Sequence, residues 1–379
     1  MSQAPETDPK ISEAESEIDQ APNGDIDDLH IAEMEYIGEG ANKKLVADGR
    51  KQMELFASVT SDEITNAIHL YDAAPKYTYD QKEFDVSVSA FEEKSMTLGG
   101  EKYEVQIQAA RIQRADGTEV LIKPGGMEEC IEDSLRKLAT SGNGVFINGD
   151  AGVKFSLYQL KTDLETHGHT YSYAQLREGL EVMRRSGLKI TDPRSGESWE
   201  EGFLVRLVKG GRRTSEKGPI YEQWYASFHL LVTKSILNFT YRQMNYPLMM
   251  SIPGQLSKYL FKRMSLVYTQ ASSDNPYQPT MNQILHESGR GFGKAVKNDI
   301  KAVTRAFDQL KAAGVILEAE ETKRVKQGNK VVNIHYNLYP SQKFIQQTID
   351  ANKRSKEVKG IAGRQKMRDL KHIISPDSE

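Results

Sequence analysis

Leu180-Glu-Val-Met-Arg-Arg-Ser-Gly-Leu188 and Phe307-Asp-Gln-Leu-Lys-Ala-Ala-Gly-Val315 are the two stretches that decide the fold of this 379-residue chain. In each, two apolar residues three positions apart close a helical pattern, and a glycine and an aliphatic residue follow at the same spacing. A glycine just after the last periodic residue is typical of a helix C-terminus. Because the stretches lie 127 residues apart, the chain contains an internal duplication at the scale of a domain.

Each stretch belongs to the same order of predicted elements. The first unit has a helix that begins at Ser156, a break at Gly168, a longer helix that begins at Ser172, and strands over 188–191 and 203–208. The second unit has a helix from Pro253, a short helix over 280–288, a longer helix with Val296, Ile300, Val303, Phe307 and Leu310 on one face, and strands over 315–320 and 331–338. Helix-turn-helix followed by a two-stranded hairpin is the winged-helix arrangement. The sequence therefore predicts an α+β fold with two tandem winged-helix domains, over residues 80–215 and 220–345.

Charge is divided unevenly along the chain. Residues 1–42 hold twelve acids and one base, a net charge of −11, whereas the other 337 residues carry 49 bases and 41 acids, a net charge of +8. The acidic part also lacks a sustained apolar period, so residues 1–45 are predicted to be a disordered leader. A basic body indicates contact with nucleic acid. Residues 346–379 are predicted to be a basic C-terminal tail, either solvated or a mobile helix.

Composition excludes several classes of protein. No run of 18 apolar residues exists, which excludes a membrane-spanning helix. The acidic, polar start of the sequence is neither a signal peptide nor a transit peptide. The single cysteine, Cys130, excludes an internal disulfide framework and a thiolate-rich zinc site. We therefore expect a cytoplasmic protein that binds no cofactor or metal.

The long helix of the second unit is the main candidate for reading DNA. Beside its apolar face it carries a second stripe of cations, and the turn between the two strands that follow it is also basic. An α-helix fits the major groove, and lysines along it neutralise phosphates. The candidate residues of this unit are Arg290, Lys294, Lys297, Lys301, Arg305, Lys323, Arg324, Lys326 and Lys330. The alternative is a solvated charged face.

The first unit offers fewer candidates for DNA contact. Ser172, Gln175 and Arg177 lie near the start of its longer helix, where side chains could reach bases, and Arg184 lies near its end. The alternative is that this unit serves mainly folding or dimerisation.

Enzymatic interpretations are weak. Gly289-Arg-Gly-Phe-Gly-Lys294-Ala295 is one residue short of a phosphate-binding loop and has alanine where a magnesium-binding Ser or Thr is needed. His167-Gly168-His169 lies in a turn between helices, not on a strand as in a nicking enzyme of the His-hydrophobic-His type. No Ser/His/Asp triad or acidic pair is apparent. The chain is predicted not to be an enzyme.

A short segment between the leader and the first unit has two interpretations. Gln52-Met53-Glu54-Leu55-Phe56 combines three apolar side chains with a glutamine. It is either an amphipathic helix that docks on the chain's own core or, over residues 46–60, a linear motif that offers apolar anchors to a groove on another protein. In its context the second interpretation is favoured, with Leu55 and Phe56 as anchors and Gln52 setting the register.

The whole order resembles the plasmid replication initiators of the TrfA type. The residues that carry the resemblance are Gln52–Phe56, Phe155–Leu164 and Tyr171–Ile190, and it covers roughly residues 50–345. The chain departs from that family in its very acidic leader, in a longer segment before the first winged helix and in its basic C-terminal extension. The resemblance implies binding to direct repeats (iterons) at a plasmid origin, monomer–dimer control of copy number, and help from host initiator and helicase. It also implies that Gln52, Met53, Leu55 and Phe56 bind the bacterial sliding clamp.

Three hypotheses follow. The first is a replication initiator that binds origin repeats and recruits the replisome. The second is a winged-helix transcriptional regulator or autorepressor without replisome contact. The third is a nicking initiator that uses His167, His169 and a tyrosine.

Overall fold

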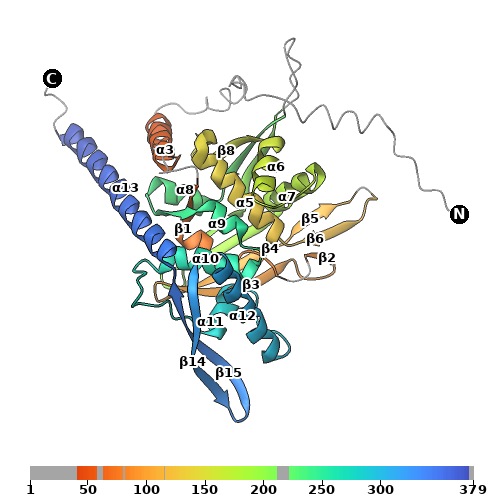
Figure 1. Cartoon of the computed structure of the whole chain (residues 1–379). Helices are drawn as coiled ribbons and strands as arrows, with labels where there is room; N and C mark the ends of the chain where they lie inside the picture. Colours follow the sequence, from red (N-terminus) through yellow and green to blue (C-terminus); the bar gives the residue numbers. More distant parts are fainter. Residues whose placement is uncertain (1–40, 58–62, 80–81, 115, 211–221, 375–379) are drawn as a thin grey trace.

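The computed structural model describes residues 41–57, 63–79, 82–114, 116–210 and 222–374 (Figure 1). The predicted acidic leader lies outside these ranges, except for its last positions, which belong to the helix α3 (Ala41–Ala57). Within the described ranges, none of the helices has the length and apolar character that a membrane span requires.

The helices of the first winged-helix unit have the predicted order, but its hairpin differs from the prediction. Residues 187–191 pair with residues 198–202, whereas the predicted partner strand, over 203–208, lies in another sheet. It consists of α5 (Gly126–Leu138), β7 (Gly144–Ile147), β8 (Asp150–Ser156), α6 (Leu157–Thr166), α7 (Tyr173–Arg185), β9 (Gly187–Thr191) and β10 (Ser198–Gly202). A five-residue π-helical turn, Ala139–Asn143, follows α5. Both α6 and α7 begin with a capping box: the hydroxyls of Ser156 and Ser172 accept from the backbone N–H of Gln159 and Gln175, whose side chains accept in return. These caps explain why both helices begin where the sequence predicts.

Three antiparallel sheets surround this unit. The strands β2 (Glu83–Asp85), β3 (Phe91–Leu98), β4 (Glu101–Gln108), β5 (Ala110–Gln113), β6 (Glu119–Ile122), β11 (Leu204–Lys209) and β12 (Gln223–Phe228) complete them. Their strand orders are β10-β9-β4-β3, β11-β12-β8-β7 and β2-β6-β5. The wing strand β9 therefore pairs with β10 on one side and with β4 on the other.

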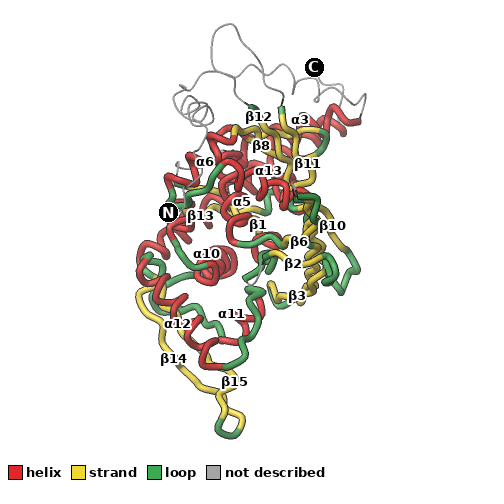
Figure 2. The backbone as a smooth tube through the Cα atoms, turned by 90° about the vertical axis from the view of Figure 1, so that its right-hand side faces the viewer, coloured by secondary structure: helices red, strands yellow, loops and turns green. Residues whose placement is uncertain are grey.

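The second winged-helix unit lies at the other end of the molecule (Figure 1). It comprises α10 (Gln255–Val267), α11 (Met281–Glu287), α12 (Val296–Ala312), β14 (Ile316–Gln327) and β15 (Lys330–Pro340). Isolated bridges from Tyr277 to Leu338 and from Thr280 to His335 place a short third strand beside β15. Figure 1 and Figure 2 both show the β14–β15 hairpin projecting from the body. The fold class, α+β with two winged helices in tandem, is as predicted.

A ribbon of two strands joins the ends of the first unit. β1 (Ile64–Ile68) pairs antiparallel with β13 (Tyr241–Asn245), which follows α8 (Leu230–Leu237). Short helices α4 (His69–Ala73) and α9 (Tyr246–Ser251) come after the two strands. The first unit is thus inserted between two paired strands, so the predicted boundaries 80–215 and 220–345 separate strands that belong together.

The predicted basic tail is the continuation of a long helix. α13 (Gln342–Ile374) begins directly after β15 and runs for 33 residues. Its first half docks on β13, because Arg242 donates to the Asn352 side chain at 2.7 Å and to the Thr348 carbonyl at 3.2 Å. Phe344 and Val358 of α13 are buried in the hydrophobic core. The far end of α13 extends beyond the body (Figure 1).

Buried ionic side chains connect the two units. Lys262 of α10 lies 2.7 Å from a carboxylate oxygen of Asp133 and 2.9 Å from one of Glu129, both on α5. Arg136 of α5 binds Asp133 at 2.9 Å and also pairs with Asp72 of α4. We call Asp72, Lys76, Glu129, Glu132, Asp133, Arg136 and Lys262 the buried ionic cluster. Unlike a surface ion pair, such a cluster fixes geometry because every member needs its partner.

Candidate nucleic-acid interface

The longer helix of the second unit, α12, is anchored through one face. Val303, Phe307 and Leu310 are buried, and the Phe307 ring meets the Tyr336 ring of β15 edge-on at 4.9 Å. The sequence predicts Val296 and Ile300 on the same apolar face. Ile300 is half-buried, but Val296 is 38% exposed and lies outside the core, contrary to the prediction. The helix is thereby held against the hairpin with its opposite face toward solvent.

That opposite face carries the predicted cations. Lys294, Lys297, Lys301 and Arg305 are all exposed. Among the described residues, no carboxylate lies within ion-pair distance of these four side chains. Lys297, Lys301 and Arg305, four residues apart, lie on one side of α12, whereas Lys294 lies in the loop just before the helix begins at Val296. They form a stripe of cations that is available to an external anion.

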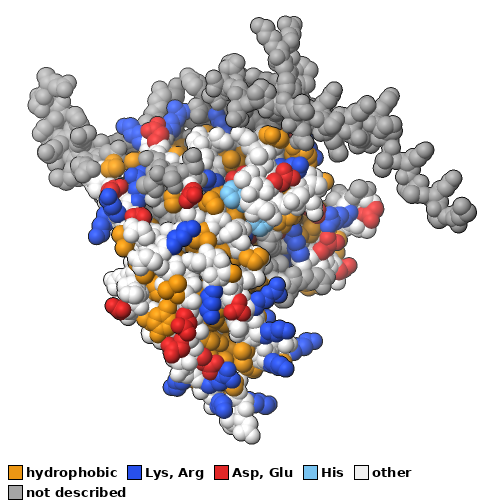
Figure 3. Space-filling model, viewed as in Figure 1, with side chains coloured by type: hydrophobic (Ala, Val, Ile, Leu, Met, Phe, Trp, Pro, Cys, Tyr) orange, Lys and Arg blue, Asp and Glu red, His pale blue; other side chains and the backbone are white. Residues whose placement is uncertain are grey.

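The β14–β15 hairpin adds a second group of cations. Lys323, Lys326 and Lys330 are exposed near its tip, where Gly328 adopts φ +60° in the two-residue turn. Arg324 is different, since its guanidinium binds Glu321 at 2.5 and 2.7 Å. Figure 3 shows Lys and Arg side chains gathered over the part of the surface where Figure 1 places α12 and the hairpin.

Arg290 is engaged inside the protein. Its guanidinium donates to Asp299 at 3.0 Å, and the Asp299 carboxylate is 2% exposed. The same oxygen accepts from the backbone N–H of Gly293 at 2.8 Å. Arg290 therefore positions the loop before α12, and its guanidinium is engaged within the protein and not presented to DNA as the sequence predicts. The sequence analysis missed Asp299, although its spacing to Val303 and Leu310 places it on the buried face of the helix.

The first unit presents a different surface. The hydroxyl of Ser172 and the amide of Gln175 are used in the capping box at the start of α7, which explains both residues without DNA. Arg177 and Arg184 are exposed. Two acids lie on the same helix, Glu178 bound to Arg114 and Glu181 bound to Arg185. α7 thus lacks the continuous cationic stripe of α12.

Both histidines of the His167-Gly168-His169 turn have internal partners. His167 Nδ1 lies 2.7 Å from the Asp163 carbonyl oxygen, and His169 Nε2 lies 3.0 Å from the Met250 carbonyl oxygen. Burial lowers the pKa of His169. In the described part of the chain, no group of three or more His, Cys, Asp or Glu side chains is placed to hold a metal ion.

The segment Gln52–Phe56 lies in the last turns of α3 and is docked on the body. Met53 and Phe56 are 3% and 0% exposed, and the Phe56 ring meets the Tyr241 ring edge-on at 5.0 Å. The Phe56 carbonyl accepts from the Asn66 side chain at 2.6 Å. Gln52 and Leu55 are only half-buried. In this conformation the two deepest anchors of the predicted linear motif are core residues, which is the docked-helix alternative.

α3 fits its site closely. A Cβ added to Gly49 would meet the Phe146 ring at 2.3 Å, and one added to Gly144 would meet the Met53 methyl at 2.3 Å. Only glycine at these positions lets α3 approach the π-helical turn and β7 so closely.

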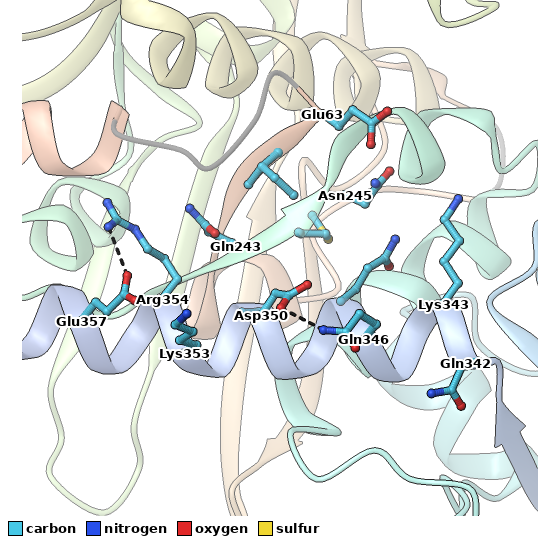
Figure 4. Close-up of a pocket in the computed structure, with 14 residues that line it drawn as sticks. Glu63, Gln243, Asn245, Gln342, Lys343, Gln346, Asp350, Lys353, Arg354 and Glu357 are labelled. Atoms are coloured by element: carbon cyan, nitrogen blue, oxygen red, sulfur yellow. Dashed lines mark hydrogen bonds and ion pairs between the residues drawn. The ribbon is translucent and has the colours of Figure 1, made fainter.

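A groove of about 750 Å³ lies between β13 and α13 (Figure 4). Most of the residues that line it have polar side chains, among them Gln243 and Asn245 on the strand and Asp350 and Lys353 on the helix. Gln346 donates to Asp350 at 3.0 Å across one turn of α13. Its polar groups thus partly satisfy one another, and the groove lies away from the cations of α12.

Comparison with known proteins finds similar structures but no matching family. No family model and no curated protein matches the sequence. Two solved structures of domains 2 and 3 of RctB are similar, with TM-scores of 0.44 and 0.42 and identities of 9% and 8%; they cover 72% and 75% of this chain, and 96% and 99% of those chains. The Pi initiator protein in complex with iteron DNA is similar with a TM-score of 0.38 and 11% identity, over 57% of this chain and 90% of that chain. An initiator protein is thus among the structures that this chain resembles.

Proposed function

We propose that this protein is a cytoplasmic plasmid replication initiator that binds direct repeats at its origin, chiefly through the second winged helix. The observation that carries the proposal is the joint placement of the free cations of α12 and of the projecting hairpin on one unit. α12 would lie in the major groove and the hairpin would follow the adjacent backbone, which gives a grip at two points. The sequence resemblance to TrfA-type initiators supplies the biological role, including copy control.

Phosphate contact predicts a measurable salt dependence. Each neutralised phosphate of duplex DNA contributes about −0.9 to the slope of log K against log salt concentration. Removing Lys294, Lys297 and Lys301 should therefore reduce the magnitude of the slope by up to about 2.7. Because these side chains are exposed, folding should be unaffected.

The experiment is a binding titration by fluorescence anisotropy. The probe is a duplex of the direct repeats from the encoding replicon, with a shuffled duplex as competitor, at several salt concentrations. The variant is Lys294→Ala/Lys297→Ala/Lys301→Ala, and the control is Lys353→Ala/Lys356→Ala/Lys359→Ala, which removes the same charge from three exposed lysines of α13. Equal weakening by both variants would show that α12 is not the reading helix. If the wild-type protein does not bind the repeats in preference to the shuffled duplex, the proposal is refuted.

Recruitment of the sliding clamp, a further part of the proposal, has to account for the docked α3. Met53 and Phe56 can enter a groove on another protein only after α3 leaves β7, so we infer that clamp binding is coupled to undocking. Gln52→Ala and Leu55→Ala test it cleanly, since both side chains are half-buried, with exposed Glu54→Ala as control. Weaker capture of purified clamp by the two variants, with a loss of stability of no more than about 1 kcal/mol, supports the contact. Capture at wild-type level in all three refutes it.

The docking of α3 favours one alternative function. A winged-helix autorepressor would need no replisome contact, and the burial of Phe56 would then be purely structural. Plasmid establishment separates the two functions: it should fail with Gln52→Ala/Leu55→Ala in an initiator that uses the clamp and proceed normally otherwise. Host initiator, replicative helicase and a homodimer are further partners implied by the resemblance.

The proposed action is binding without covalent chemistry. His167 and His169 are both held by backbone carbonyls of the protein. A single-stranded origin oligonucleotide should remain intact with the protein and Mg²⁺, Mn²⁺ or Zn²⁺. Metal-dependent cleavage would restore the nicking hypothesis.

A further inference from the structure

Phe292 is exposed at the start of the reading helix. It lies between Gly291 and Gly293, in the loop that joins α11 to α12, and its side chain is 58% exposed. Val296, in the first turn of α12, is 38% exposed. Two apolar side chains are therefore left in water directly beside Lys294 and Lys297, which are also exposed. Isolated exposed apolar residues are common, but the loop that carries Phe292 is held in place by hydrogen bonds.

The loop is held by hydrogen bonds on both sides of Phe292. Asp299 accepts from the Gly293 N–H at 2.8 Å and from the Arg290 guanidinium at 3.0 Å. The Gly291 N–H donates to the Leu285 carbonyl at 2.9 Å. Gly291 itself has φ +71°, a backbone angle that favours glycine, and it lies in the turn directly before Phe292. These hydrogen bonds fix the loop in the conformation that exposes Phe292.

We propose that Phe292, together with Val296, reads thymine methyl groups in the major groove. This inference rests on the proposed function. In helix-turn-helix proteins the first residues of the second helix meet base edges. The C5-methyl of thymine is the apolar feature of the major groove, and phenylalanine can contact it. The adjacent lysines favour an anionic duplex over an apolar pocket on a protein partner as the occupant.

The chemistry gives the expected size of the effect. Loss of one buried methyl corresponds to a factor of about four in affinity. Truncation of the phenyl ring removes its contact with more than one base, so Phe292→Ala should weaken binding by about tenfold or more. Since Phe292 is largely exposed in the free protein, its truncation should leave the melting temperature unchanged.

The test is a double-mutant cycle between protein and DNA. Wild type and Phe292→Ala are titrated with the repeat duplex and with the same duplex in which uracil replaces thymine, which deletes only the methyl groups. The expected result is weaker binding of wild type to the uracil duplex, weaker binding of Phe292→Ala to the thymine duplex, and a smaller effect of uracil in Phe292→Ala, where only Val296 remains, than in wild type. Leu317→Ala, at a 71% exposed apolar side chain of β14, is the matched control and should behave as wild type.

Each outcome has a distinct meaning. If Phe292→Ala binds the repeats as tightly as wild type, or if the uracil effect persists in full in the variant, the methyl-reading assignment is overturned. If Phe292→Ala binds repeats normally but loses a protein partner, the surface is a protein-binding one and the assignment is likewise overturned. If wild type does not prefer the repeats at all, the proposed function has failed before the inference is reached.

Discussion

Replacing Lys262 by methionine tests the buried ionic cluster that joins the two winged helices. The Lys262 side chain is only 5% exposed, and its ammonium lies 2.7 Å from Asp133 and 2.9 Å from Glu129. Burial alone disfavours the charged form, but the two carboxylates hold the pKa of Lys262 above its ordinary value. Methionine is an unbranched side chain close to lysine in size, and it removes the charge.

The expected loss follows from what remains after the change. Removing one partner of a buried ion pair costs about 3–5 kcal/mol of the free energy of unfolding. Asp133 keeps Arg136 at 2.9 Å, so part of its charge stays compensated. We therefore expect the low end of the range, about 3 kcal/mol, with Glu129 the group left most poorly paired.

Urea unfolding followed by the fluorescence of Trp199 and Trp224 measures this loss. Lys311→Met, at an exposed lysine of α12, is the control and should change stability by less than about 0.5 kcal/mol. Lys262→Met/Glu129→Gln should recover part of the loss because it removes the uncompensated carboxylate. A loss below about 1 kcal/mol for Lys262→Met, or no recovery in the double variant, would refute this account of how the units are joined.

Two further predictions concern the core. Burial lowers the pKa of His229 to about 4 from 6.5, so the unfolded chain takes up a proton between those values that the folded ring does not, and stability falls as pH drops through that window. Between pH 7 and 5 this group should account for about 2 kcal/mol of lost stability, and His229→Asn should show a correspondingly shallower pH dependence in urea titrations. Phe56→Ala should cost about 3 kcal/mol and open α3 to proteolysis near Arg50, whereas Leu55→Ala should cost about 1 kcal/mol or less. Equal effects of the Phe56 and Leu55 changes would contradict the docking of α3.

The duplicated units were predictable because their signals are local. Ser156 and Ser172 begin helices through hydrogen bonds that span three residues, and Gly187 and Gly314 follow directly on the ends of helices. Such signals are visible in a short window of sequence. The cations of α12 were predictable for the same reason, since a helical stripe depends only on spacing.

Whether Gln52–Phe56 forms a docked helix or a free linear motif depends on residues that are distant in the sequence. An amphipathic helix and a linear motif have the same local pattern, and only the presence of Phe146 and Tyr241 at the docking site distinguishes them. The pairing of β1 with β13 is equally distant and could not be read from either strand alone.

Buried charges cannot be recognised from a local pattern for the same physical reason. Glu129, Glu132 and Arg136 of α5 have the pattern of a solvated helix face, yet all three are buried against partners from α4 and α10. Arg290 was assigned to DNA because its partner, Asp299, was not recognised as a buried acid. A charged residue shows its role only when the positions of its counter-charges are known.

The length of α13 fixes a distance within the molecule. The helix begins two residues after β15 ends, and Ser341 between them is fixed by its hydrogen bonds to Gly314 and Val315. At 1.5 Å per residue its 33 residues span about 50 Å. The far end of α13 is thereby kept at a set distance from the base of the β14–β15 hairpin. Inserting whole turns of helix would change that distance in steps of about 5.4 Å without altering either end.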